Sequence, residues 1–178
     1  MFFEKTTLWF FRIAQWCLCV SLLGISGHLV NEYAKAHSRV PPEVWLPCIT
    51  SAFAICILAY SITLLCCLGR LLLHIAAFFD FCFMVTYIAA VVLNRHNFHQ
   101  DGTQNRTWQS LTYIRQQAGI DNHGNKNLPL VKAMVGITTT LMVLYIITTL
   151  LCMNLARLAD EKHEEKKTGH RRRSTSRV

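Results

Sequence analysis

Two charged side chains interrupt long apolar stretches of this sequence: Arg12 near its start and Asp80 in its middle. An unpaired charge at the centre of a membrane-spanning helix costs about 2.5–3.5 kcal/mol even on scales derived from helix insertion. If both stretches enter a bilayer from the same side, the depths of the two charges differ by about 8 Å, which an arginine side chain nearly spans. The sequence therefore predicts a buried Arg12–Asp80 ion pair that joins two helices.

Two other interpretations of these charges are open. In the first, the Arg12 side chain extends to the lipid headgroups and Asp80 stays protonated. In the second, Asp80 takes part in a proton or ion relay with Tyr87, which shares its helix face at i, i+7, and with His74, whose position fits less well. The second interpretation makes a small ion or proton transporter or channel the alternative function class.

The remaining reactive side chains match no catalytic or metal site. His96, His99, Asp101 and the distant His123 lack cysteine neighbours and helical spacing, so we interpret them as polar loop residues. The sequence also lacks paired acids and a nucleophile with an adjacent base. We therefore expect no catalytic residue, no metal, no cofactor and no enzyme.

Composition excludes most soluble classes of protein. Apolar residues make up 52% of the 178 residues and charged residues 16%, against about 25% charged in an average soluble domain. The formal net charge is +8, but the basic residues lie mostly in polar connections and near the C-terminus. Since no basic domain is present to bind a duplex, we expect a membrane protein with no nucleic-acid partner.

Four apolar segments are long enough to cross a bilayer, which takes about 20 residues of helix. Each is uniformly apolar, as expected for a helix that faces lipid or other apolar helices. We predict an all-α membrane protein, a four-helix transmembrane bundle over residues 8–154, between a short N-terminal segment, 1–7, and a basic, disordered tail, 155–178. The predicted spans are 8–30, 45–67, 71–93 and 129–153, and the longer connections are 31–44 and 94–128.

The distribution of Lys and Arg predicts the orientation. If both termini are cytosolic, that side of the membrane holds 11 of the 18 basic residues, in line with the usual cytosolic enrichment. Asn105 begins an N-glycosylation sequon, Asn-Arg-Thr, which agrees with a lumenal long connection and makes Asn105 a candidate glycosylation site. The first span is longer than the apolar region of a signal peptide and contains Arg12, so we expect it to be retained.

All eight cysteines lie inside predicted spans, and we interpret most of them as small apolar packing residues. Cysteines next to a membrane boundary are candidates for S-acylation, commonly by palmitate. Cys66 and Cys67 fall at the cytosolic end of the second span, and Cys152 falls at a similar depth in the fourth. These three are the predicted acylation sites.

The tail carries a basic cluster directly before two hydroxyl side chains. Such a cluster attracts anionic cytosolic lipids by about 1 kcal/mol per charge near the surface. Arginines two and three residues before a serine are typical of a basophilic kinase site, and a phosphate there would weaken the attraction to lipid. We predict anionic-lipid contact through Arg171, Arg172 and Arg173 and phosphorylation at Ser174 or Thr175.

Within the long connection, Trp108, Leu111, Ile114 and Arg115 recur at near-helical spacing. This pattern predicts a short helix that lies on the lumenal headgroups.

Neither of the two predicted lumenal connections contains a cysteine.

Two of the predicted spans carry motifs of a known family. The first contains RIAQ at 12–15 and GISG at 24–27, and the third contains Asp80 followed by YIAAVVLNR at 87–95. These spans resemble those of the fungal MARVEL-domain four-span proteins, over most of residues 8–153. Many members of that family carry cysteines in the second lumenal loop, and this chain has none there.

The resemblance implies a non-enzymatic, integral multi-pass protein of the plasma membrane or an endomembrane. Such a protein would organise membrane domains or act in membrane trafficking. Its expected partners are the lipid bilayer, anionic lipids at the tail and other membrane proteins, with a homo-oligomer as one possible form.

Overall fold

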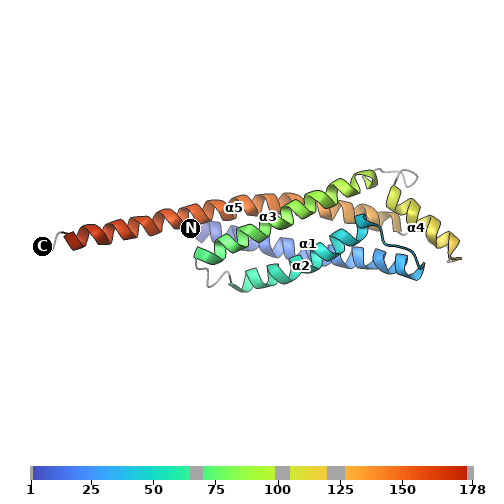
Figure 1. Ribbon diagram of the computed structural model, residues 1–178, viewed down its shortest axis with the longest axis horizontal. Coiled ribbons are helices and arrows are strands. Elements are labelled where there is room, and N and C mark those ends of the chain that lie inside the picture. The colour runs from blue at the N-terminus through green and yellow to red at the C-terminus, as the bar shows by residue number, and fades with distance from the viewer. Residues whose placement is uncertain (1, 65–69, 99–104, 120–126, 176–178) are drawn as a thin grey trace.

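The computed structural model describes the backbone of residues 2–64, 70–98, 105–119 and 127–175, and these are almost entirely helical (Figure 1). Within these ranges there is no strand, in agreement with the all-α prediction. The elements are α1 (Phe2–Lys35), α2 (Pro42–Leu64), α3 (Arg70–Leu93), the 3-10 helix η2 (Asn94–Asn97), α4 (Arg106–Gln117) and α5 (Asn127–Thr175).

Four helical segments are long and apolar enough to cross a membrane: Thr6–Lys35, Pro42–Ile62, His74–Asn97 and Leu128–Leu155. They confirm the four predicted spans, and the first and third continue into the predicted connections. α1 packs mainly against α2 and α5, and α3 packs mainly against α5. The N-terminus and the C-terminal part of α5 lie at one end of the bundle, the tail end, and α4 lies at the other, the α4 end (Figure 1).

α1 ends in a Schellman cap, which shortens the connection to α2. The backbone N–H of Ser38 donates to Tyr33 O at 3.1 Å, and that of His37 donates to Ala34 O at 3.0 Å. His37 adopts the left-handed conformation, with a φ of 49°, at the position where glycine is usual. α2 then begins at Pro42, whose fixed φ suits the first position of a helix.

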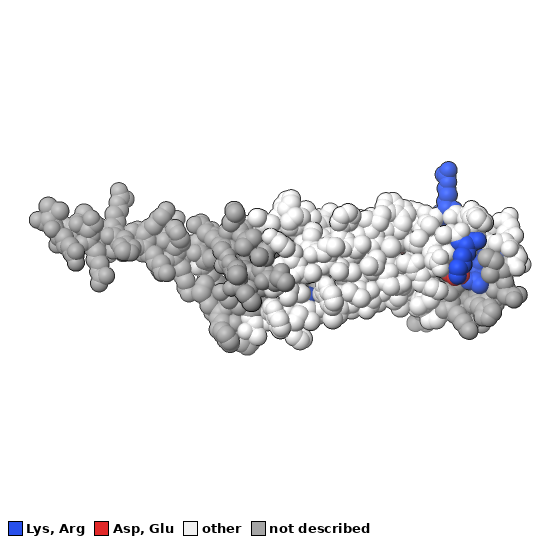
Figure 2. Space-filling model, turned by 90° about the horizontal axis from the view of Figure 1, so that it is seen from below, with Lys and Arg blue, Asp and Glu red and all other residues white. Residues whose placement is uncertain are grey.

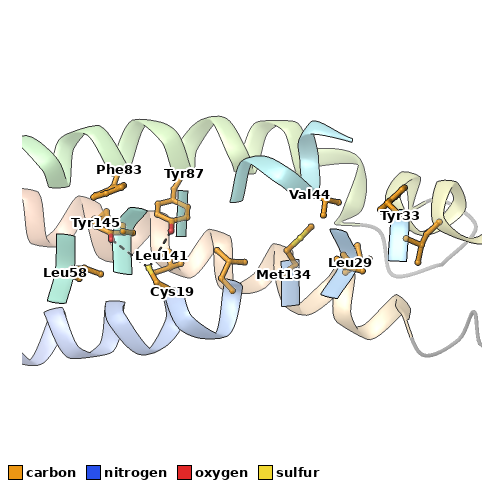
Figure 3. Close-up of a cluster of buried hydrophobic side chains, with 14 residues drawn as sticks. Cys19, Leu29, Tyr33, Val44, Leu58, Phe83, Tyr87, Met134, Leu141 and Tyr145 are labelled. Atoms are coloured by element: carbon orange, nitrogen blue, oxygen red, sulfur yellow. Dashed lines mark hydrogen bonds between the residues drawn. The ribbon is translucent and has the colours of Figure 1, made fainter. Parts of the chain in front are cut away.

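A buried apolar core fills the bundle from its middle to the α4 end (Figure 3). All four spanning helices contribute to it. In lipid, such a core is stabilised by close packing of side chains more than by exclusion of water. The fully buried members include Leu22, Leu29, Val44, Met134 and Leu141.

The outward surface of the spanning helices is also apolar. Phe53, Phe78, Phe81 and Leu150 are each at least 50% exposed. Figure 2 shows Lys and Arg gathered at the α4 end of the visible face, beside a middle region with almost no charged atoms. Soluble monomers rarely expose so large an apolar surface, so this surface indicates contact with a lipid bilayer.

The C-terminal tail differs from the prediction. We expected 155–178 to be disordered, whereas α5 continues as a helix to Thr175. The segment after Leu155 is rich in Glu, Lys and Arg, which favour helix, and it contains no proline. Because extending an existing helix is far easier than starting one, the fourth span supports a polar continuation that its composition alone did not predict.

Candidate functional site

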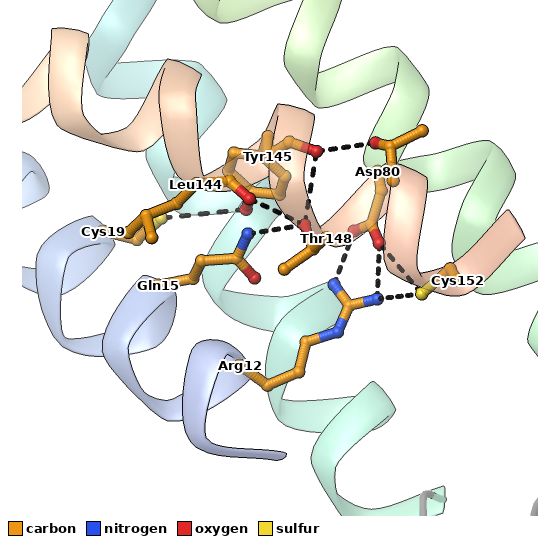
Figure 4. A network of polar contacts seen from close by, with 9 residues as sticks. Arg12, Gln15, Cys19, Asp80, Leu144, Tyr145, Thr148 and Cys152 are labelled. Atoms are coloured by element: carbon orange, nitrogen blue, oxygen red, sulfur yellow. Dashed lines mark hydrogen bonds and ion pairs between the residues drawn. The ribbon is translucent and has the colours of Figure 1, made fainter. Parts of the chain in front are cut away.

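Arg12 and Asp80 form an ion pair inside the tail-end half of the bundle (Figure 4). Arg12 Nη1 lies 2.5 Å from Asp80 Oδ1, and Arg12 Nη2 lies 2.6 Å from Asp80 Oδ2, so both arms of the guanidinium are used. The two residues are 2% and 1% exposed. The structure therefore brings together, between α1 and α3, the two charges that the sequence paired.

The pair lies within the apolar belt of the molecule. Outward-facing apolar side chains on α3 run from Ile75 to Leu93. Asp80 follows Ile75 by five residues, so it lies about 7.5 Å along α3 from the first described side chain of this belt. At this depth two opposite charges that share a bidentate contact cost much less than either charge would alone.

Cys152 brings α5 into the same cluster. Its Sγ lies 3.7 Å from Asp80 Oδ2 and 3.8 Å from Arg12 Nη2, and the residue is fully buried. An acyl chain on this sulfur would have to displace the ion pair. The packed bundle therefore does not expose Cys152 for the acylation that the sequence predicted. Cys66 and Cys67 lie outside the described residues, and their acylation stays a prediction.

Further polar contacts continue along α1 from the ion pair. Gln15 Nε2 donates to Thr148 Oγ1 of α5 at 3.0 Å, one turn from Arg12. On the next turn, Cys19 Sγ lies 3.6 Å from the hydroxyl of Tyr87 and 4.0 Å from that of Tyr145. We call these side chains, together with the ion pair and Cys152, the polar network (Figure 4, with Tyr87 in Figure 3).

Sequence reasoning missed the α1 and α5 members of the polar network other than Arg12 and Cys152. The available signal was periodicity, since Gln15 and Cys19 follow Arg12 at i+3 and i+7 and so share its helix face. On α5, Thr148 and Tyr145 likewise precede Cys152 at i−4 and i−7 and share its helix face. Only the packing of α5 against α1, however, pairs that face with Gln15 and Cys19.

The relay interpretation is not assembled by the described contacts. The hydroxyl of Tyr87 contacts Cys19, and the Tyr87 ring stacks on that of Tyr145 at 5.4 Å between centroids. His74 is exposed on α3. Tyr87 therefore joins the polar network through Cys19.

Buried apolar side chains lie at both ends of the polar network. Toward the tail end, Leu8 and Leu155 pack with Cys152 as a separate buried cluster. Toward the α4 end, Cys19, Tyr87 and Tyr145 belong to the same buried cluster as the fully buried Leu22 and Leu141. Among the described residues, the polar network thus lies between buried apolar side chains on both sides along the bundle.

A second ion pair lies at the α4 end and was not predicted. Arg115 of α4 pairs with Glu32 of α1, and Lys35 Nζ also lies 3.3 Å from Glu32. Glu32 is only 8% exposed. The sequence placed Glu32 in a polar connection because the predicted first span stopped at residue 30, whereas α1 continues to Lys35.

Buried amide side chains attach α4 to the bundle. Asn97 Nδ2 donates to Thr107 Oγ1 at 2.6 Å, and the backbone N–H of Thr107 donates to Asn97 Oδ1 at 3.0 Å. Tyr33 also donates to the carbonyl of Thr107, at 3.3 Å. These contacts join α1, η2 and α4 at one point.

Asn105, the predicted glycosylation site, is the N-cap of α4. Its Oδ1 accepts a hydrogen bond from the backbone N–H of Trp108 at 3.0 Å, and its Nδ2 donates to Asn97 O at 3.1 Å. The residue is fully buried. Nδ2 is the atom that would carry a glycan, so the folded α4 end leaves no access to it, and the sequon no longer supports the orientation.

The helix predicted around Trp108 exists as α4, but its apolar face contacts the protein. Leu111 is 2% exposed, and Ile114 packs against the apolar core. Tyr113, on the opposite face, is 65% exposed. The prediction that this apolar face lies on the headgroups is therefore wrong, because the bundle itself covers Leu111 and Ile114.

The tail residues with predicted roles lie on the last turns of α5. The structure describes their backbone but not their side chains. Lipid contact by Arg171, Arg172 and Arg173 and phosphorylation of Ser174 or Thr175 stay predictions.

Within the described residues, no group of three or more His, Cys, Asp or Glu side chains is placed to hold a metal ion. His96 accepts a hydrogen bond from Arg95 Nε at 3.1 Å, and His99, Asp101 and His123 lie outside the described residues.

Comparison with known proteins adds no further assignment. No protein-family model, no curated protein and no solved structure matches this chain.

Proposed function

We propose that this protein is a non-enzymatic membrane protein that organises membrane domains, or acts in membrane trafficking, through lateral contacts with lipids and other membrane proteins. One observation carries the proposal. The buried charged groups inside the bundle pair with each other, as Arg12 does with Asp80, whereas the outward surface is apolar and extensive. Such a molecule offers its outer surface, rather than an internal site, to other molecules.

The ion pairs support a structural role for the buried charges. Arg12 and Asp80 join α1 to α3, and Glu32 and Arg115 join α1 to α4. A charge held for chemistry or transport would need access to a substrate, an ion or water. Both pairs instead use their charged atoms to hold helices together.

The resemblance to the fungal MARVEL-domain proteins also favours this proposal. It supplies the membrane-organising role, which composition and contacts alone do not suggest. It rests on the motifs around Arg12 and Asp80. In the fold these two residues join α1 to α3 through their ion pair.

We further propose that both termini are cytosolic and that the α4 end is lumenal, in the plasma membrane or an endomembrane. The Lys and Arg distribution favours this orientation. The shared position of the N-terminus and the α5 continuation at the tail end is consistent with an even number of spans (Figure 1).

A transporter or channel is the second candidate, and it depends on Asp80. A buried acid within the apolar belt often marks an ion or proton path. Against this, Asp80 is paired with Arg12, and buried apolar side chains that include Leu8 and Leu22 lie on both sides of the network.

Reconstitution separates the two candidates. We expect liposomes that contain the wild-type protein to show no proton or potassium flux above protein-free liposomes. In giant vesicles with coexisting ordered and disordered phases, we expect the labelled protein to concentrate in one phase. Flux in the wild type that disappears with Asp80→Asn would overturn the proposal, and so would even partitioning between the phases.

The outer surface supplies a matched comparison for the partition experiment. Phe78→Ser and Phe81→Ser change outward-facing side chains of α3, and Phe83→Leu changes a buried one on the same helix. We expect the two outward variants to alter the partition and the buried variant to preserve it.

A further inference from the structure

We propose that one water molecule is bound inside the polar network, between Nε of Arg12 and Oε1 of Gln15. The proposal concerns the interior of the bundle and does not depend on the proposed function. It rests on two buried polar atoms that find no hydrogen-bond partner among the described residues, Arg12 Nε and Gln15 Oε1.

The two atoms are complementary. Arg12 Nε carries a hydrogen and can only donate, and Gln15 Oε1 can only accept. A water molecule accepts from the first and donates to the second, so it satisfies both at once. The assignment of the Gln15 amide is fixed by Thr148, whose hydroxyl donates to Leu144 O and therefore accepts from Gln15 Nε2.

The two side chains also lie on the same side of one helix. Arg12 and Gln15 are three residues apart on α1, which places them one above the other on its surface. Figure 4 shows both extending from α1 toward α5, with the Gln15 amide next to Thr148 and the guanidinium next to Cys152. The other guanidinium nitrogens of Arg12 are already used, since Nη1 and Nη2 contact Asp80 and Nη2 also lies 3.8 Å from Cys152 Sγ.

The surroundings favour a retained water over an open channel. Arg12 is 2% exposed and Gln15 is fully buried, so bulk solvent does not satisfy these atoms. Leu8 and Leu155 pack with Cys152 at the tail end of the network. Buried waters with about three polar neighbours are regular components of protein interiors, at about one per 27 residues.

Water-detected NMR of the full-length protein in detergent micelles tests the proposal directly. The probe is the Nε–Hε group of Arg12, labelled with nitrogen-15, and the measurement is its magnetisation transfer with water. We expect nuclear and rotating-frame Overhauser signals of opposite sign, which indicate a long-lived neighbouring water rather than proton exchange. Signals of equal sign, or no transfer at all, would overturn the proposal.

Two variants assign the signal to the proposed position. Thr148→Ser keeps the hydroxyl that accepts from Gln15 Nε2 and so keeps Oε1 in place, and we expect the water signal to persist. Gln15→Met removes the acceptor, and we expect the signal to fall below detection. A full-strength signal in Gln15→Met would contradict the proposal. If that variant does not fold, Gln15→Asn, which withdraws the carbonyl by one methylene, gives the same comparison.

Discussion

The side-chain amide of Asn94 replaces the backbone N–H that Pro47 lacks. In a regular helix the N–H of residue 47 would donate to the carbonyl of Glu43, but proline has no such hydrogen. Asn94 Nδ2 donates to Glu43 O at 3.2 Å and also to Ala90 O at 2.9 Å, from a fully buried position. A proline inside a membrane-spanning helix is thereby accommodated by a neighbouring helix end.

This relationship predicts an energetic coupling between Asn94 and Pro47. Asn94→Ala should lower the free energy of unfolding by about 1–3 kcal/mol, because it leaves buried polar groups without partners. In a Pro47→Ala background the helix supplies its own donor to Glu43 O, so Asn94→Ala should cost less. Unfolding by sodium dodecyl sulfate in mixed micelles, followed by circular dichroism, measures the difference. Pro42→Ala, at the first position of α2, is the matched control and should show no coupling.

The Arg12–Asp80 pair predicts a second, larger effect. Asp80→Asn leaves the guanidinium buried without a counter-charge and should lower the free energy of unfolding by about 3–5 kcal/mol. The double variant Arg12→Met/Asp80→Leu removes both charges and should recover most of that loss, because apolar replacements of buried pairs are often neutral. The same unfolding titration compares the variants. A double variant no more stable than Asp80→Asn would show that the pair is not the reason for the loss.

The Schellman cap of α1 predicts a stabilising substitution. His37 holds a φ of 49°, which glycine adopts without strain, so His37→Gly should raise the free energy of unfolding by about 0.5–1 kcal/mol. Gly119, with a φ of 66°, gives the converse test, and Gly119→Ala should lower stability by about 1–2 kcal/mol. Opposite signs in the unfolding titration are expected. A loss of stability in both variants would contradict the left-handed assignment of His37.

The N-cap of α4 predicts that Asn105 is not glycosylated in the folded protein. Endoglycosidase treatment of protein purified from eukaryotic cells should leave its electrophoretic mobility unchanged. Asn105→Ala should weaken α4 by about 0.5–2 kcal/mol, seen as faster hydrogen exchange of its first-turn amides, whereas Asn105→Asp keeps the capping oxygen. A glycan found at Asn105 would mean that the buried cap does not form in the cell.

Hydropathy predicted the four spans and the ion pair but not the ends of the bundle. The cost of burying Arg12 and Asp80 in lipid was enough to pair them, because few other charges lie in the spans. Glu32 and Arg115 were not paired because Glu32 fell in a predicted connection and Arg115 in a short helix expected to lie on the headgroups. Only the folded position of α4 against α1 brings the two residues together. The Asn94–Glu43 contact likewise has no local signature, since the two residues come from different helices.

The unbroken course of α5 has a consequence for the basic residues near its end. Arg171 follows Leu155 by 16 residues, so a straight helix carries its charge about 24 Å beyond the apolar span. At physiological salt, electrostatic attraction is screened over about 8 Å. A disordered chain would let these arginines reach the headgroups of their own bilayer. A straight helix instead holds them about three screening lengths from the apolar span. With a straight α5, the basic end of the helix therefore contacts molecules that face the membrane before it contacts the lipids of its own bilayer.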